Sequence, residues 1–237
     1  MALGRLRPIL RRLAESERAR KRVAGSPRWV KEIASDIAYG PAQPRQWVRT
    51  VMDQDLSRLF EELQREPLDV VEVSGALRES NRWGSYTQLH YPEFDLCDPG
   101  PVPGQFDLVI CEQVLEHVTD PERAVRTLKT LCRPHGHVVV STPFLIRVHE
   151  DPGDYWRFTA DGLRLLLERG GLSPVWVRSW GNRKALRANL GGWARQLPWR
   201  SLRNEPDVPL VVWALARVTA QAATEDGPRA SRRGAQG

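Results

Sequence analysis

Polar residues and one glycine lie at or just beyond the ends of two of the apolar runs that we expect to form buried strands. One set lies at the end of the run 69–73 and the other beyond the run 106–111; together they are Glu72, Ser74, Gly75, Glu112, Gln113 and His117. In a mainly parallel sheet with helices on both faces, ligands bind beyond the carboxyl ends of the strands. These residues are therefore candidates for a ligand-binding site.

A third set of polar residues follows the apolar run that ends at Pro143. His149 is the candidate general base here, because an unperturbed imidazole has a pKa of about 6.5 and works near neutrality. Asp154 is a second candidate catalytic residue, and the adjacent acids Glu150 and Asp151 would raise the pKa of His149. The spacing of the histidines and of the three cysteines matches no metal pattern, so we expect no metal site.

The elements that must position these residues can be predicted from apolar runs and from helix caps. We expect strands over 69–73, 106–111, 137–142, 172–180 and 208–218, with one or two further short strands within 85–96. Asp120-Pro121 predicts the start of a helix that ends near Arg133-Pro134. Thr159 predicts a cap for a second helix, which Gly170-Gly171 ends.

Strands that alternate with helices predict an α/β fold with a doubly wound, mainly parallel sheet. We expect seven strands, of which the last is antiparallel and lies at an edge, because no long helix separates the final two. The predicted segments are a basic N-terminal arm (1–26), a helical segment (27–66), a main domain (67–218) with an insertion at 181–207, and a disordered tail (219–237). The insertion is basic and contains Trp193, so we expect a lid or a substrate-recognition element.

The charge of this chain of 237 residues is unevenly distributed. The arm 1–26 has eight basic and two acidic residues and so carries the whole net charge of +6. It could contact anionic lipid, RNA or an acidic partner, or it could be a solvated leader. The neutral remainder argues against a polyanion-binding body. No apolar run is long enough for a transmembrane helix, and we expect a cytoplasmic protein.

The residues around these strand ends resemble the class I S-adenosylmethionine-dependent methyltransferases. The resemblance is carried by the segments DVVEVSG, FDLVICEQVLEHVTDPERAVRTLKTLCRPHGHVVVSTP and DYWRFTADGLRLLLERGGL, and it covers about 69–218. The loop after the first strand has one glycine, Gly75, where this family usually has two or three. Serine can replace glycine where the backbone angles are ordinary, so we expect Ser74-Gly75 to be a working donor loop.

The resemblance also implies roles for individual residues. Glu72 is expected to hold the ammonium end of S-adenosylmethionine, and Glu112 and Gln113 to contact its methionine and sugar parts. Tyr91 or Asp95 is expected to meet the ribose or the adenine. His117 is expected to pack near the donor or to cap its own loop.

The function that the resemblance implies is methyl transfer to a small molecule, with the hydroxyl of a sugar or a natural product as the expected acceptor. One alternative is an RNA or protein methyltransferase that is anchored by the basic arm. The other is a binding module that keeps the fold and has lost catalysis. The segment EQVLEHV (112–118) favours an enzyme over a binding module.

Overall fold

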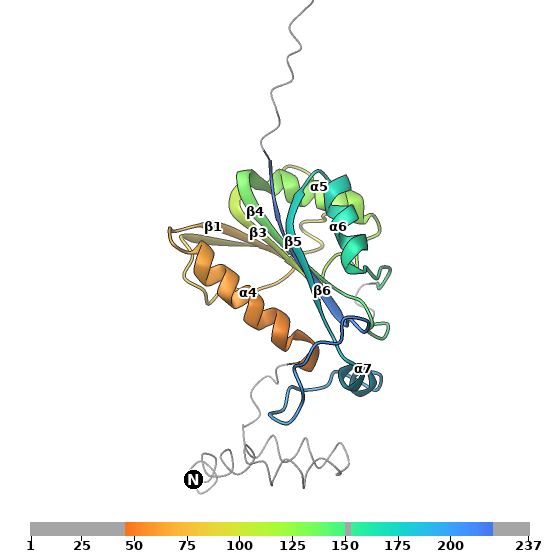
Figure 1. The fold of residues 1–237 in the computed structure, drawn as a ribbon. Helices are drawn as coiled ribbons and strands as arrows, with labels where there is room; N and C mark the ends of the chain where they lie inside the picture. Colours follow the sequence, from red (N-terminus) through yellow and green to blue (C-terminus); the bar gives the residue numbers. More distant parts are fainter. Residues whose placement is uncertain (1–45, 150–152, 220–237) are drawn as a thin grey trace, which may run out of the picture.

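The computed structural model describes residues 46–149 and 153–219, and the described chain is built around a single sheet (Figure 1). Six strands form this sheet: β1 (Asp69–Val73), β2 (Ser85–Leu89), β3 (Phe106–Glu112), β4 (Cys132–Pro143), β5 (Ser173–Trp180) and β6 (Val211–Arg217). Their order is β2-β1-β3-β4-β6-β5. The strand runs predicted from the sequence are confirmed, but the described residues form six strands instead of seven. Only 85–89 of the predicted 85–96 region is a strand.

The helices begin and end largely where their capping residues predict. After a 3-10 turn, η1 (Trp47–Arg49), the helices are α4 (Thr50–Leu63), α5 (Pro121–Leu131), α6 (Ala160–Arg169) and α7 (Arg183–Asn189). The Asp120 carboxylate accepts a hydrogen bond from the Arg123 amide at 2.9 Å, and the Thr159 hydroxyl accepts one from the Gly162 amide at 3.0 Å. Both predicted caps are therefore confirmed. No helix in the described ranges is long and apolar enough to cross a membrane.

The position of the last strand differs from the prediction. Strands β1 to β4 are parallel, and β6 is antiparallel as expected, but β6 lies between β4 and β5 and not at an edge. Its residues 211–216 are all buried, whereas several residues of β5 are exposed or half-buried. A continuous apolar run is typical of an interior strand and an interrupted one of an edge strand, which explains the observed order.

Each face of the sheet has its own apolar core. Alternate residues such as Val71 and Val109 pack with α5 and α6, while Val70 and Leu108 on the opposite face pack with α4. Figure 1 shows α4 on one side of the sheet and α5 with α6 on the other. This two-sided packing, with strands that alternate with helices, confirms the doubly wound α/β fold.

Two connections between strands contain no helix. Residues 74–84 join β1 to β2, and residues 90–105 join β2 to β3, through turns and extended chain. Trp83, near the end of the first connection, packs its ring edge against Phe60 of α4, with 5.6 Å between the ring centroids. This loop therefore covers part of a sheet face, next to α4. The predicted arm (1–26), the part of the helical segment (27–66) before residue 46 and the tail beyond 219 lie outside the described residues.

Candidate active site

The larger of two adjoining pockets lies at the carboxyl ends of β1 and β3, beside the connection that follows β2. Its volume is about 540 Å³, and its lining includes five of the predicted site residues: Ser74, Tyr91, Asp95, Gln113 and His117. The carboxyl ends of parallel strands are where a doubly wound sheet binds ligands. The structure thus brings together residues that are 43 positions apart in the sequence, from Ser74 to His117.

The chain leaves the sheet at this pocket in an unusual backbone conformation. Ser74 has a φ of +54° and Gln113 a φ of +58°, both in the left-handed region. The Ser74 amide donates to the Leu89 carbonyl at 2.7 Å, and the Gln113 amide donates to the Ser141 carbonyl at 2.8 Å. The expectation of ordinary backbone angles at Ser74 is therefore wrong. Strained backbone of this kind is found at functional sites.

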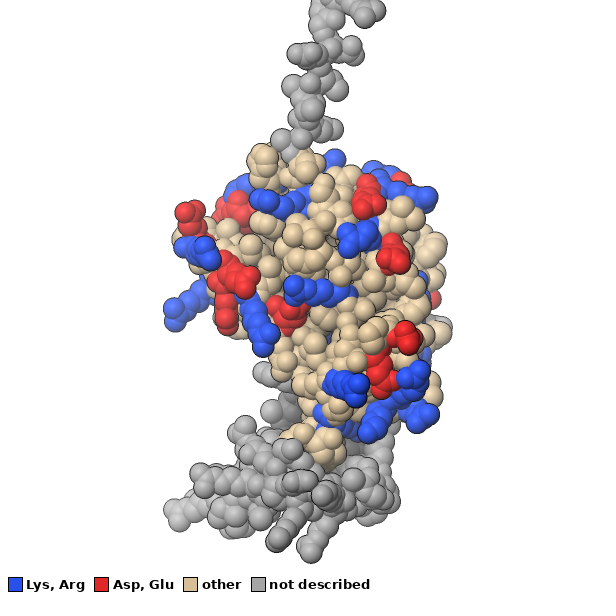
Figure 2. All heavy atoms as spheres, viewed as in Figure 1, with Lys and Arg blue, Asp and Glu red and all other residues tan. Residues whose placement is uncertain are grey.

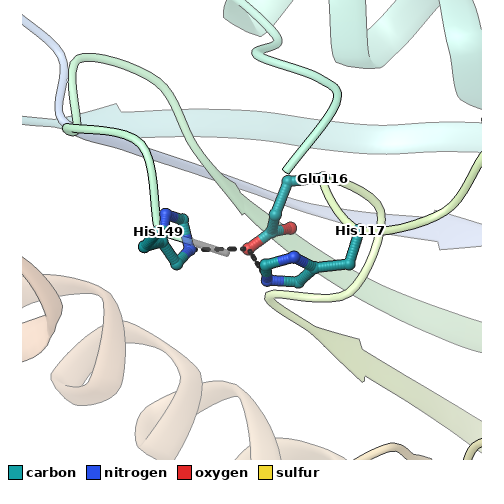
Figure 3. A group of neighbouring side chains, drawn as sticks. All are labelled: Glu116, His117 and His149. Atoms are coloured by element: carbon teal, nitrogen blue, oxygen red, sulfur yellow. Dashed lines mark ion pairs between the residues drawn. The ribbon is translucent and has the colours of Figure 1, made fainter. Parts of the chain in front are cut away.

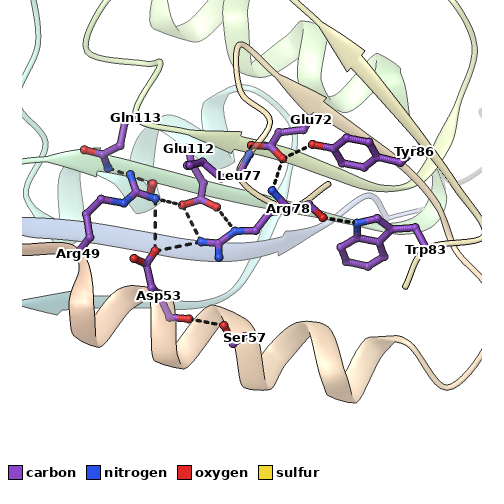
Figure 4. Close-up of polar contacts among 11 residues, drawn as sticks. Arg49, Asp53, Ser57, Glu72, Leu77, Arg78, Trp83, Tyr86, Glu112 and Gln113 are labelled. Atoms are coloured by element: carbon purple, nitrogen blue, oxygen red, sulfur yellow. Dashed lines mark hydrogen bonds and ion pairs between the residues drawn. The ribbon is translucent and has the colours of Figure 1, made fainter. Parts of the chain in front are cut away.

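Glu72 does not line this pocket. Its carboxylate accepts hydrogen bonds from the amides of Leu77 and Arg78, at 2.9 and 3.0 Å, and from the Tyr86 hydroxyl at 2.5 Å (Figure 4). A Cβ at Gly75 would lie 2.5 Å from Glu72 Oε1, so a side chain here would displace the Glu72 carboxylate. Glu72 and Gly75 therefore shape the loop after β1, and the structure does not place the Glu72 carboxylate at this pocket.

Glu112 does not line this pocket either. Its carboxylate is held by two arginines: Arg49 Nη2 lies 2.6 Å from Oε2, and Arg78 Nε lies 2.6 Å from Oε1 (Figure 4). Side chains of a strand alternate between its two faces, and Glu112 shares the face of Leu108 and Ile110, which α4 covers. The expectation that the Glu112 side chain contacts the donor is not supported by this geometry.

Tyr91 and Asp95 both reach the larger pocket from the connection after β2. Tyr91 is 59% exposed, whereas the Asp95 carboxylate accepts a hydrogen bond from the Cys97 amide at 2.7 Å. Asp95 is thus partly engaged within its own turn. The geometry places both residues beside the pocket, and which of them meets a ribose stays a prediction.

A second, smaller pocket adjoins the first. Its volume is about 220 Å³, and Gln113 and His117 line both pockets. The smaller pocket is also lined by His149 and by Trp193, a residue of the predicted insertion 181–207. His149 thus lies beside the smaller pocket and does not line the larger one, in agreement with its expected position beyond the loops that follow β1 and β3. The insertion contributes at least one aromatic side chain to the wall of the smaller pocket.

A buried acid that we did not predict lies beside these histidines. Glu116 is fully buried, and its Oε1 lies 3.7 Å from His117 Nε2 and 3.9 Å from His149 Nε2 (Figure 3). Neither carboxylate oxygen has a hydrogen bond of good geometry within the described ranges, although the Glu116 amide, the charge of Arg157 and the Thr142 hydroxyl favour the charged form. Burial raises the pKa of Glu116 to about 8.

Asp154 positions His149. One of its oxygens accepts a hydrogen bond from the His149 amide at 2.8 Å and lies 3.3 Å from the imidazole Nδ1. Arg157 donates to both oxygens of this carboxylate, and its hydrogen bonds lower the pKa of Asp154 to about 2. Burial lowers the pKa of His149, contrary to the increase expected from Glu150 and Asp151, which lie outside the described residues. With the Asp154 side chain 1% exposed, we assign it a supporting role.

The sheet order, the antiparallel strand beside β4 and the pocket at the carboxyl ends define the fold of a class I S-adenosylmethionine-dependent methyltransferase. A family model described as a methyltransferase domain matches residues 39–176, which is more than half of the chain. The chain belongs to this methyltransferase family, whose methyl donor is S-adenosylmethionine.

Curated relatives match shorter parts of the chain. A ubiquinone biosynthesis O-methyltransferase of Pseudomonas aeruginosa is 35% identical over 96 residues, which are 40% of this chain and 37% of the relative. The protein of the same name from Cupriavidus pinatubonensis is 58% identical over 40 residues, 17% of this chain and 16% of the relative. The chain thus covers well under half of the length of these relatives.

Among solved structures, the 1,6-didemethyltoxoflavin-N1-methyltransferase of Burkholderia thailandensis is similar to this chain with a TM-score of 0.47 and 16% identity. The similarity covers 85% of this chain and 88% of that protein.

Proposed function

We propose that this protein transfers a methyl group from S-adenosylmethionine to a hydroxyl of a small molecule, such as a sugar or a natural product. The larger pocket holds the donor and the smaller pocket holds the acceptor. The observation that carries this proposal is that the two pockets share Gln113 and His117. A methyl group can pass in line from donor to acceptor only where the two sites meet.

The transfer requires a nucleophile with a free lone pair. The acceptor oxygen attacks the methyl carbon, the oxygen–carbon bond forms as the carbon–sulfur bond breaks, and the hydroxyl proton must leave. His149 lines the acceptor pocket and is the group best placed to take this proton. Its lowered pKa keeps the imidazole neutral, and so able to accept a proton, near pH 7. The curated relatives are named as O-methyltransferases, which supports oxygen as the acceptor atom.

The two alternative functions have less support. Figure 2 shows basic and acidic side chains interspersed on the viewed face of the described residues, not gathered into one basic surface of the kind that binds RNA strongly. The basic arm, on which RNA or protein anchoring would depend, lies outside the described residues. A binding module without catalysis would not require a second pocket that adjoins the first.

The first test is donor binding by the full chain. We expect calorimetry to detect the binding of S-adenosylmethionine and of S-adenosylhomocysteine. Either ligand should also raise the melting temperature of the protein, because each would bind only the folded state. Replacing Gln113, which lines both pockets, by alanine should weaken donor binding at least fivefold. Gln105→Ala is the matched control, because Gln105 is exposed and lies at the opposite end of β3.

The second test is a screen of hydroxylated small molecules with a radiolabelled methyl donor. Label transferred to a sugar or a phenol would support the proposal, whereas transfer only to RNA or protein would overturn the acceptor assignment. No heat and no thermal stabilisation at millimolar donor would overturn the enzyme assignment itself.

A further inference from the structure

Three side chains with metal-binding atoms converge at the border of the two pockets. One carboxylate oxygen of Glu116 and one ring nitrogen each of His117 and His149 all lie within 4.8 Å of one another (Figure 3). An ion of the size of Zn²⁺ holds its ligand atoms at about 2.0–2.2 Å, so that two neighbouring ligands of one ion lie about 3.4 Å apart. The separations of 3.7 and 3.9 Å from Glu116 Oε1 to the two Nε2 atoms are close to this value.

The carboxylate in this cluster lacks the partners that a buried acid needs. Glu116 is fully buried, and among the described residues neither of its oxygens accepts a well-formed hydrogen bond. A buried polar group without a partner costs free energy, and a buried charge without one costs much more. The distances from the two imidazoles are too long for hydrogen bonds. A cation between the three groups would supply the missing partner.

Both imidazoles are held with Nε2 directed into the cluster. His117 Nδ1 contacts the Gly153 carbonyl oxygen, and His149 Nδ1 lies 3.3 Å from Asp154 Oδ2. An acceptor beside Nδ1 fixes the proton on that nitrogen, which leaves the Nε2 lone pair free to bind a metal. Metal-binding histidines in proteins usually have such a carbonyl or carboxylate partner behind them.

We propose that Glu116, His117 and His149 bind a divalent first-row transition-metal ion, such as Zn²⁺, Mn²⁺ or Fe²⁺. Two imidazoles and one carboxylate are a donor set that these ions accept, whereas Mg²⁺ and Ca²⁺ prefer oxygen ligands throughout. The two histidines are 18% and 21% exposed and line the smaller pocket. The ion would therefore keep an open position toward the acceptor, as catalytic metal sites do.

With the ion bound, His149 is a ligand and not the general base. A hydroxyl that binds the open position has a lowered pKa, as bound water does, and can lose its proton to solvent water. The resulting oxygen forms its bond to the methyl carbon as the carbon–sulfur bond breaks. This catalytic role rests on the proposed function, but binding of the ion does not, because the three ligands come from the protein alone.

The test uses Co²⁺ as a probe, because Co²⁺ bound by nitrogen and oxygen ligands absorbs visible light. The full chain without a histidine tag is stripped with EDTA, dialysed and titrated with CoCl₂ in the absence of any methyl donor. We expect one Co²⁺ per chain, displacement by ZnCl₂ and no competition from equimolar MgCl₂. Glu116→Gln, His117→Ala and His149→Ala should each weaken Co²⁺ binding at least tenfold.

His135→Asn is the matched control, since it also removes one of the five histidines but lies exposed near the amino end of β4, whereas Pro143 at the carboxyl end of β4 lines the smaller pocket. It should bind Co²⁺ as the wild type does. Circular dichroism and donor calorimetry on each metal-free variant separate loss of the ion from loss of folding or of donor binding. No Co²⁺ absorption in the folded wild type, or equal affinity in all four variants, would overturn the proposal.

Discussion

At the scale of single residues, the most informative feature is the left-handed backbone at the ends of β1 and β3. Ser74 and Gln113 both have positive φ angles, and both line the larger pocket. Non-glycine residues adopt this conformation at a cost, and the surrounding structure has to hold them there. In this loop with few glycines, Ser74 therefore adopts a backbone conformation that costs a serine more than a glycine. In return, the serine places a hydroxyl at the pocket that glycine would not provide.

This strain predicts how substitutions at Ser74 affect stability. Valine is β-branched and is an outlier at positive φ, so Ser74→Val should lower the free energy of unfolding by about 1–3 kcal/mol. Ser74→Gly should stay within about 0.5 kcal/mol of the wild type, because glycine adopts this φ freely. Urea denaturation measures both. Equal losses for valine and glycine would show that the backbone conformation at this position is not the cause.

The residues of the site could be predicted in part. The positions of Ser74, Gln113 and His149 at the pockets follow from a simple rule, since each comes after a predicted strand. Glu72 and Glu112 follow the same rule but point to the face of the sheet that α4 covers. Both carboxylates accept hydrogen bonds from Arg78, which lies 34 positions before Glu112. No local sequence pattern predicts such a pairing.

Glu116 was missed for the same reason. In the sequence it is one acid within an apolar stretch, which does not distinguish a ligand from a solvated side chain. Its partner His149 comes from the connection after β4, so the cluster exists only once the sheet has formed. The expectation of no metal site rests on spacing along the sequence, which carries no information about such distant pairs, and it stays a prediction.

At the scale of elements, Arg78 fastens the loop 74–84 to both α4 and the sheet. Its guanidinium bonds to Glu112 of β3 and to Asp53 of α4, the latter at 3.1 Å, and it lies over the ring of Phe60 at 5.4 Å from the centroid. This loop has no helix of its own to pack on the sheet. The ion pairs of Arg78 therefore join this loop to β3 and to α4.

Removing this side chain should be strongly destabilising. Arg78→Ala leaves Glu112 buried with one fewer cation, and breaking a buried pair costs about 3–5 kcal/mol. The matched control is Arg126→Ala on α5, whose pair with Glu122 has the same 2.6 Å separation but is exposed, so its loss should cost less than about 1 kcal/mol. Urea denaturation measures both. If Arg78→Ala fails to fold, Arg78→Lys should lose an amount of unfolding free energy between the values expected for the two alanine variants. Similar losses of unfolding free energy in Arg78→Ala and Arg126→Ala would contradict the prediction.

The elements themselves could largely be predicted, but their order in the sheet could not. The strand runs and the two caps were correct because they depend on local periodicity and on single capping side chains. The place of β6 between β4 and β5 depends on pairing with a strand about 70 residues earlier. The one local sign of this place is that Val211–Ala216 is apolar at every position, which is typical of an interior strand.

At the scale of the whole molecule, His137 links stability to pH. Burial, and secondly the charge of Arg217 on the neighbouring strand, lower the pKa of His137 from its ordinary value of 6.5. As pH falls below about 6.5, the unfolded chain takes up a proton at this position before the folded protein does. The neutral His137 ring therefore contributes to the free energy of unfolding above this pH, and this contribution is lost as the pH falls.

Replacing His137 by glutamine should remove this part of the acid sensitivity. Between pH 7.5 and pH 5.5 the melting temperature of the wild type should fall further than that of His137→Gln, although the difference is small because the ring is only half-buried. The melting temperature of His135→Asn, a substitution of an exposed histidine two residues earlier in β4, should change with pH as that of the wild type does. Parallel pH profiles for wild type and His137→Gln would show that another group is responsible.

The place of β6 also has a consequence for the order in which the protein can assemble during synthesis. Within the described residues β5 pairs with β6 and with no other strand, and β6 separates it from β4. A nascent chain that ends before Val211 can join β1 to β4 but has nothing to attach β5 to. One side of the sheet, with the wall that Leu210 and Val211 give the smaller pocket, can form only after β6 has left the ribosome.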